Sequence, residues 1–146
     1  MSDPPKRKRL RLQNHDYAEN GFYFLTFCTK GKRQILSEVI NDTEHGAYVR
    51  LLPYGIITER FISNIPGIDK YVIMPNHVHL IIHKTNGKSI FGDMRSLKGL
   101  ITKTIGENIW QVSYYDHIIR NESDYLEKCR YIDENPARWA DDEYNT

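Results

Sequence analysis

The sequence predicts an α+β fold, a sandwich of ferredoxin-like character in which helices cover a largely antiparallel sheet. Three observations predict it: strand-like runs with alternating apolar residues, segments with apolar residues at helical spacing, and the order of these segments. That order is strand, hairpin, helix, two strands, helix, strand and helix. A chain of 146 residues is long enough to bury a substantial core. We therefore expect one domain over residues 13–146.

The first part of this domain carries three of the expected elements. Residues 22–29 (FYFLTFCT) are aromatic and β-branched with apolar alternation, which predicts a strand. Residues 35–41 and 46–52 flank the turn-forming NDTEHG and predict a hairpin. Residues 54–65 place apolar residues at helical intervals and end before a Pro-Gly pair, which predicts a helix.

The second part begins with two strands, 70–74 and 77–84, separated by a Pro-Asn break and closed by the turn TNGK. Residues 89–105 have the apolar face of an amphipathic helix. Residues 111–118 predict a short aromatic strand, and 122–134 a last helix that ends before a proline.

Composition excludes several classes of protein. With 40% hydrophobic and 27% charged residues, the chain resembles a soluble globular protein, and no segment approaches the ~18 apolar residues of a membrane span. The basic N-terminus is followed by polar residues where a signal peptide needs an apolar core. Cys28 and Cys129 match no metal-binding or redox spacing, so we expect reduced thiols in a cytoplasmic protein.

Residues 1–12 form a basic arm, which we expect to be flexible. Only Asp3 offsets its basic residues, which are Lys6, Arg7, Lys8, Arg9 and Arg11. Basic arms of this kind often contact nucleic-acid phosphates, although a solubilising tail or a targeting signal has the same composition. The arm therefore suggests a nucleic-acid partner without establishing one.

His77 and His79 are two residues apart in the strand 77–84, so their side chains project from the same face. Val78, Leu80 and Ile82 point to the other face and supply the core. Two imidazoles at this spacing can converge on one divalent ion. A polar sheet face that happens to carry histidines is the alternative, so a metal site needs further ligands.

The last helix supplies a candidate. Asn121 is a plausible N-cap, and the expected core-facing residues are Tyr125, Leu126, Cys129 and Ile132. Tyr131 falls on the opposite side, with Asn135 one turn later on that same side. With His77 and His79, Asn135 would complete three ligands for a cation that activates a phosphate, and Tyr131 would attack phosphorus. Simple solvent exposure is the alternative for Tyr131.

Three segments resemble one family. VIMPNHVHLII resembles the His-hydrophobic-His (HUH) motif of single-tyrosine transposases of the IS200-like and REP-associated group. WQVSYYDHIIRNESDYLEKCRYIDENPARW resembles the C-terminal signature of that group, and KRLRLQNHDYAENGFYFLTFCT its opening arm and first strand. The resemblance runs from about residue 7 to the C-terminus, with the three motifs in the family's order.

The resemblance implies an HUH endonuclease that cleaves and rejoins single-stranded DNA at hairpin-forming sequences, leaving a 5′-phosphotyrosine and a free 3′-OH. It implies a divalent ion, Mg²⁺ or Mn²⁺, with His77, His79 and Asn135 as ligands and Tyr131 as nucleophile. Tyr114 and Tyr115 are rival nucleophiles, but neither has a ligand at helical spacing. Members of the wider group act alone or as homodimers, and both states are compatible with the sequence.

Basic residues outside the arm are the other candidate phosphate contacts: Arg95, Lys98, Lys103 and Arg120. A solvated helix face explains the lysines and arginines equally well. Trp110 and Tyr115 could stack on unpaired bases, although core packing suits Trp110 better.

Three other functions compete with nicking. A histidine-triad nucleotide hydrolase would need a third histidine where this chain has Ile81. A purely structural metal domain is disfavoured because three mixed ligands leave an open position. A non-catalytic or domesticated hairpin-binding module on the same fold is the main alternative, although all four site residues are present.

Overall fold

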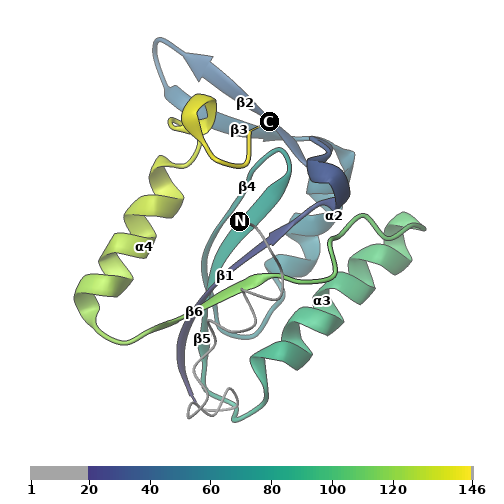
Figure 1. Cartoon of the computed structure of the whole chain (residues 1–146), viewed down its shortest axis with the longest axis vertical. Helices are drawn as coiled ribbons and strands as arrows, with labels where there is room; N and C mark the ends of the chain where they lie inside the picture. Colours follow the sequence, from purple (N-terminus) through teal and green to yellow (C-terminus); the bar gives the residue numbers. More distant parts are fainter. Residues whose placement is uncertain (1–19, 146) are drawn as a thin grey trace.

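The computed structural model describes residues 20–145, and its elements follow the predicted order (Figure 1). The strands are β1 (Gly21–Cys28), β2 (Ser37–Asp42), β3 (Gly46–Leu51), β4 (Ile68–Ile73), β5 (His77–Lys84) and β6 (Tyr115–Ile119). The α-helices are α2 (Pro53–Ile62), α3 (Ile90–Ile105) and α4 (Glu122–Glu134). Two short 3-10 segments are η1 (Lys30–Lys32) and η2 (Trp139–Asp141).

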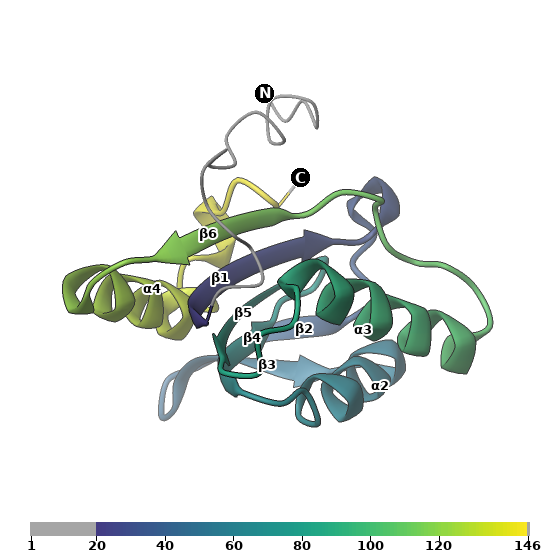
Figure 2. The same cartoon turned by 90° about the horizontal axis from the view of Figure 1, so that it is seen from below.

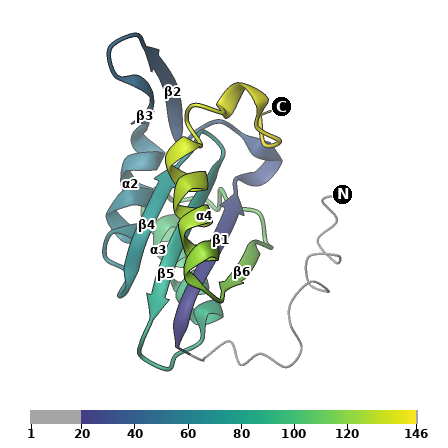
Figure 3. The ribbon, with the colours of Figure 1, turned by 90° about the vertical axis from the view of Figure 1, so that its left-hand side faces the viewer.

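The main sheet has the strand order β4-β5-β1-β6, and each neighbouring pair is antiparallel. The β2–β3 hairpin forms a separate two-stranded sheet. Helix α4 lies over one face of the main sheet, and α2 and α3 lie over the other (Figures 2 and 3). The predicted α+β fold with a largely antiparallel sheet is confirmed.

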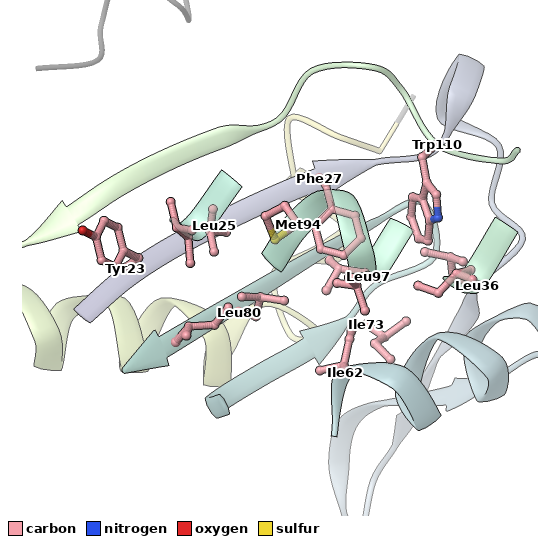
Figure 4. Close-up of a cluster of buried hydrophobic side chains, with 14 of the residues drawn as sticks. Tyr23, Leu25, Phe27, Leu36, Ile62, Ile73, Leu80, Met94, Leu97 and Trp110 are labelled. Carbon is pink, nitrogen blue, oxygen red and sulfur yellow. The ribbon is translucent and has the colours of Figure 1, made fainter. Parts of the chain in front are cut away.

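The larger core lies between the main sheet and helices α2 and α3 (Figure 4). Alternate residues of β1 and β5 enter it, because successive side chains of a strand point to opposite faces. They are Tyr23, Leu25, Phe27, Val78, Leu80 and Ile82. The amphipathic face of α3 closes this layer with Met94, Leu97 and Ile101. The inner face predicted for the strand 77–84 is confirmed.

A smaller apolar cluster lies on the opposite face, under α4. Phe24 of β1, Ile81 of β5 and Ile119 of β6 pack there against Ile132 of the helix. Polar contacts hold α4 on both sides of this cluster. Tyr125 donates to Asp69 at 2.6 Å on the β4 side.

On the β6 side, His117 pairs with Asp124 at 2.7 Å. Asn121 caps the helix by accepting from the Asp124 amide at 2.8 Å, as predicted. Helix α4 therefore spans the face of the sheet from β4 to β6.

Two expectations about local structure are wrong. Leu126 is 50% exposed, because the residues of α4 that face the sheet are centred on Lys128 and Ile132, on the other side of the helix. The strand expected over 111–118 begins only at Tyr115. The chain before it makes only a short bridge to the end of β1, where the Gln111 amide donates to the carbonyl of Cys28 at 2.9 Å and Trp110 is paired with Thr29. Lys98 of α3 also donates to the carbonyl of Gln111, at 2.8 Å, and no regular strand forms before Tyr115.

The flexible basic arm predicted for residues 1–12 lies outside the described residues. Among residues 20–145, no helix is both long and apolar enough to cross a membrane.

Gly55 permits the close approach of α2 to the segment before β2. A Cβ at this position would overlap the carbonyl oxygen of Leu36. We expect Gly55→Ala to lower the free energy of unfolding by about 2 kcal/mol, despite the higher helix propensity of alanine. Urea unfolding followed by circular dichroism measures this change.

Gly99→Ala in α3 is the matched control, since its Cβ would meet no atom within 4 Å. It should raise the free energy of unfolding by up to about 1 kcal/mol. Stabilisation by both substitutions would contradict the close approach at Gly55.

Candidate active site

The two histidines of β5 lie side by side under α4. Their ring centroids are 4.7 Å apart, and His77 and His79 are 0% and 1% exposed. Their placement follows from the register of β1 on β5, which sets His77 opposite Cys28 and His79 opposite Thr26. Burial lowers the pKa of His77 to about 4 and lowers the pKa of His79 well below its ordinary value. Both imidazoles are therefore neutral near pH 7, which is the protonation state that binds metals.

Asn76 fixes the tautomer of His77. Its Nδ2 donates to the carbonyl oxygens of Lys32 and Tyr144, at 3.3 and 2.7 Å, which turns Oδ1 toward His77. That oxygen lies 2.8 Å from Nδ1 of the imidazole. Because an amide oxygen only accepts, Nδ1 carries the proton and Nε2 carries the lone pair.

Asn135 follows the last residue of α4 and is 1% exposed. Its Nδ2 donates to the carbonyl of Tyr131 at 3.1 Å, so its Oδ1 faces Nε2 of His77 at 3.4 Å. Two acceptors thus oppose each other without a proton between them. A cation is the partner that both would accept.

His79 adds a second buried imidazole nitrogen to the site. Nδ1 lies 2.6 Å from the Thr26 hydroxyl, and Nε2 is buried without a hydrogen-bond partner. When Nδ1–H donates to Thr26, the lone pair lies on Nε2, which is the tautomer that metal binding requires. An orphaned imidazole nitrogen beside a pair of opposed acceptors fits a divalent cation held by nitrogen and oxygen ligands.

Tyr131 lies beside these groups, one turn before Asn135. Its ring is 5.0 Å from the ring of His79 and 6.1 Å from that of Phe24, and the residue is 36% exposed. It therefore borders the site as well as solvent, and it does not point away from the sheet as the helical pattern suggested. Burial, with a smaller contribution from the Asp142 carboxylate, raises the pKa of its hydroxyl, while the Asn135 side chain lowers it.

The segment after η2 contributes two groups that the sequence did not single out as site residues. The ring of Tyr144 stacks on His77 at 4.2 Å. A carboxylate oxygen of Asp142 lies 4.0 Å from Nε2 of His77, and this side chain is only 5% exposed. The acidic composition of this end was visible in the sequence, but nothing there pairs it with a strand some sixty residues earlier.

Another group of metal-binding residue types lies in the turn between β2 and β3, where Asp42, Glu44 and His45 meet. Asp42 already accepts from the backbone amides of Glu44 and His45, at 2.7 and 3.3 Å. These contacts are typical of a polar turn at the exposed end of a hairpin. The group carries no orphaned atom that requires an ion.

The candidate DNA contacts outside the arm lie apart from the histidines. Arg95 and Lys103 are exposed on α3, across the sheet from the site, and Arg120 is exposed after β6. Lys98 uses its ammonium group to hold the chain before β6. The basic residues of the arm, from Lys6 to Arg11, fall outside the described part of the chain.

The rival tyrosines differ in position. Tyr114 packs against the larger core, and Tyr115 lies on the α4 side of β6. Trp110 is 1% exposed and packs against Phe27, so core packing is the correct interpretation for it.

Comparison with known proteins gives consistent results, although no family model matches the chain. A REP-associated tyrosine transposase of Escherichia coli strain K12 is 36% identical over 125 residues, covering 84% of this chain and 70% of that protein. An uncharacterised protein of Haemophilus influenzae is 31% identical over 170 residues, covering 94% of this chain and 92% of its own.

A solved structure of a REP-associated tyrosine transposase bound to a REP hairpin has a TM-score of 0.65 to this chain at 24% identity. The match covers 89% of this chain and 74% of the other. It shows a shared fold.

Removal of the Thr26 hydroxyl tests whether His79 is held in place as a metal ligand. Thr26→Val keeps the side-chain shape and removes the group that orients the imidazole, so we expect Mn²⁺ affinity to fall about tenfold or more. Isothermal titration calorimetry measures this affinity. Thr58→Val is the control, since its buried hydroxyl donates to the carbonyl of Tyr54 within α2. Equal affinity in both variants and the parent would contradict a ligand role for His79.

Proposed function

The chain belongs to the REP-associated tyrosine transposases, and from that membership we propose that it nicks and rejoins single-stranded DNA at hairpin-forming sequences, with Tyr131 as nucleophile. One observation carries the proposal. Two buried imidazoles and the Asn135 oxygen lie beside a partly exposed tyrosine on the helix that also holds Asn135, and Nε2 of His79 has no hydrogen-bond partner. A site with this donor set and an adjoining hydroxyl suits phosphoryl transfer.

His77, His79 and Asn135 would hold the divalent ion, Mg²⁺ or Mn²⁺. When bound, such an ion offsets negative charge on the phosphate and makes phosphorus more electrophilic. The shell around the ligands supports this role, because Asn76 and Thr26 orient the two imidazoles. The Asp142 carboxylate adds an oxygen donor at the edge of the same site.

Tyr131 would supply the attacking oxygen. Because burial raises the pKa of its hydroxyl, the phenol needs an activated phosphate and a proton acceptor in order to react near neutral pH. The tyrosine oxygen forms a bond to phosphorus, and the bond from phosphorus to the 3′ oxygen breaks. The phenolic proton is transferred to the departing 3′ oxygen or to water. The products are a 5′-phosphotyrosine and a free 3′-OH, and the reverse reaction rejoins DNA.

Hairpin DNA is the proposed partner because the solved relative of the same fold is bound to a REP hairpin. Arg120, exposed at the end of β6, is a candidate phosphate contact near α4. The basic arm of residues 1–12 would add charge to this interaction. Monomeric or homodimeric action stays a prediction to be tested by sedimentation.

Replacement of the proposed nucleophile gives the first test. Tyr131→Phe should abolish the covalent protein–DNA adduct formed with a single-stranded hairpin library in Mn²⁺, and hairpin affinity should change less than about twofold. Denaturing gel electrophoresis and mass spectrometry of the linked peptide measure the adduct.

Tyr125→Phe is the matched control on the same helix, because its hydroxyl is engaged with Asp69 on the far side. An adduct that is still formed by Tyr131→Phe but is lost in Tyr115→Phe would identify Tyr115 of β6 as the nucleophile. Hairpin binding without any adduct in the parent protein would favour the non-catalytic module.

Removal of a proposed ligand gives the second test. His77→Ala should lower the nicking rate at least about 100-fold, while the protein remains folded because a neutral imidazole contributes little to the apolar core. Nicking of a radiolabelled hairpin and thermal melting are measured together. A collapsed, aggregated variant would instead indicate a structural role for this histidine.

A further inference from the structure

A cavity of about 410 Å³ opens between β1, β6 and α4, immediately beside His79 and Tyr131. Its size falls at the lower end of the range typical of small-molecule sites. The rings of Phe24, Tyr115 and Tyr144 contribute to its wall, from three different parts of the chain. Aromatic faces gathered around one opening provide stacking surfaces for a planar, uncharged ring system.

The charges at this cavity disfavour a phosphate. Glu127 and Glu143 border it with two carboxylates, and Lys128 supplies one cation. That cation is already paired with Asp124 at 2.9 Å and lies 3.6 Å from Glu127. A phosphate group entering here would meet net negative charge, whereas a nucleobase carries no charge at neutral pH. The part of a nucleotide that suits this cavity is its base.

Lys128 is held in place from the sheet. Asp124 Oδ1 accepts from Lys128, and Asp124 Oδ2 lies 2.7 Å from Nε2 of His117 on β6. The Lys128 side chain is only 19% exposed, and its ammonium lies 5.9 Å above the ring of Phe24. An ammonium fixed in this way has protons left to donate to the ring nitrogens or carbonyl oxygens that every base presents.

We propose that this cavity binds one unpaired nucleobase of the single-stranded substrate, next to the phosphate that Tyr131 attacks, with Tyr115 as a stacking surface and Lys128 as hydrogen-bond donor. The inference rests on the proposed function and adds a subsite to it. Tyr131 and His79 border the same cavity, so binding of this base would place the phosphate of the same nucleotide against them, where the proposed divalent ion would offset the negative charge of the cavity. His117 then acts as a positioning residue, through Asp124 and Lys128.

The test measures binding with Tyr131→Phe protein in EDTA, so that neither cleavage nor metal contributes. The probe is the tightest-binding hairpin selected from a library with a fixed stem and random single-stranded flanks. Each flanking nucleotide is replaced in turn by an abasic one, and affinity is followed by fluorescence anisotropy. We expect one flanking position at which loss of the base weakens binding roughly tenfold, the scale of base–aromatic stacking.

Combined substitutions assign that position to the cavity. In the Tyr131→Phe background, Tyr115→Ala should weaken binding of the intact probe by a similar factor. In that variant the abasic replacement should cause no further loss of affinity. Tyr115→Phe should retain most of the affinity of the Tyr131→Phe protein. Lys128→Met should also weaken binding at this position. Lys88→Met, which removes an equal charge from an exposed loop, should leave the position-specific effect unchanged. Thermal melting confirms that each variant is folded.

The outcomes separate the two proposals. A parent protein that nicks DNA, combined with abasic effects that persist unchanged in Tyr115→Ala, overturns the subsite and leaves the nicking function standing. A coupled abasic effect in a protein that forms no adduct supports the subsite and contradicts nicking. Failure of the Tyr131→Phe protein to bind any member of the library overturns the subsite.

Discussion

The pairing of β1 with β5 is the constraint on which the rest of the molecule depends. Because the strands alternate, one register places Val78, Leu80 and Ile82 in the larger core and turns His77 and His79 toward α4. A slip of one residue would exchange these faces, burying two imidazoles among aliphatic side chains and exposing the core residues. The apolar core thus fixes the position of the polar site, although no core residue touches the bound phosphate in the proposed reaction.

The cost of burying polar groups explains the shell around the histidines. Desolvation keeps both imidazoles neutral, and each has a neighbour that engages Nδ1, namely Asn76 for His77 and Thr26 for His79. Nε2 of His79 is left without a partner, which is unfavourable for a buried polar atom. In the proposed metal site this cost in stability would have a use, since ligands organised in advance need not rearrange when a cation binds.

Much of this arrangement could be predicted from local patterns. Alternation along 77–84 gave the shared face of the histidines, and the four-residue interval from Tyr131 to Asn135 placed those two on one side of a helix. Contacts between distant segments were beyond such reasoning. The position of Leu126 was misjudged because its apolar character suggested a core face, whereas polar contacts with β4 and β6 set the rotation of α4. Likewise, the pairing of Thr26 with His79 and of Asp142 with His77 depends on register and chain reversal.

The anchoring of α4 would limit how the proposed strand exchange can proceed. The helix carries both Tyr131 and Asn135, and it is fastened to β4 by the Lys70–Asp133 ion pair at 2.7 Å and to β6 through Asp124. The proposed nucleophile and the proposed ligand would therefore move together with this helix. In the proposed reaction, the covalently held DNA end would then stay where it was captured. The search for a joining partner would fall to the free 3′ strand, whose diffusion and base pairing would set the pace of the second half of the reaction.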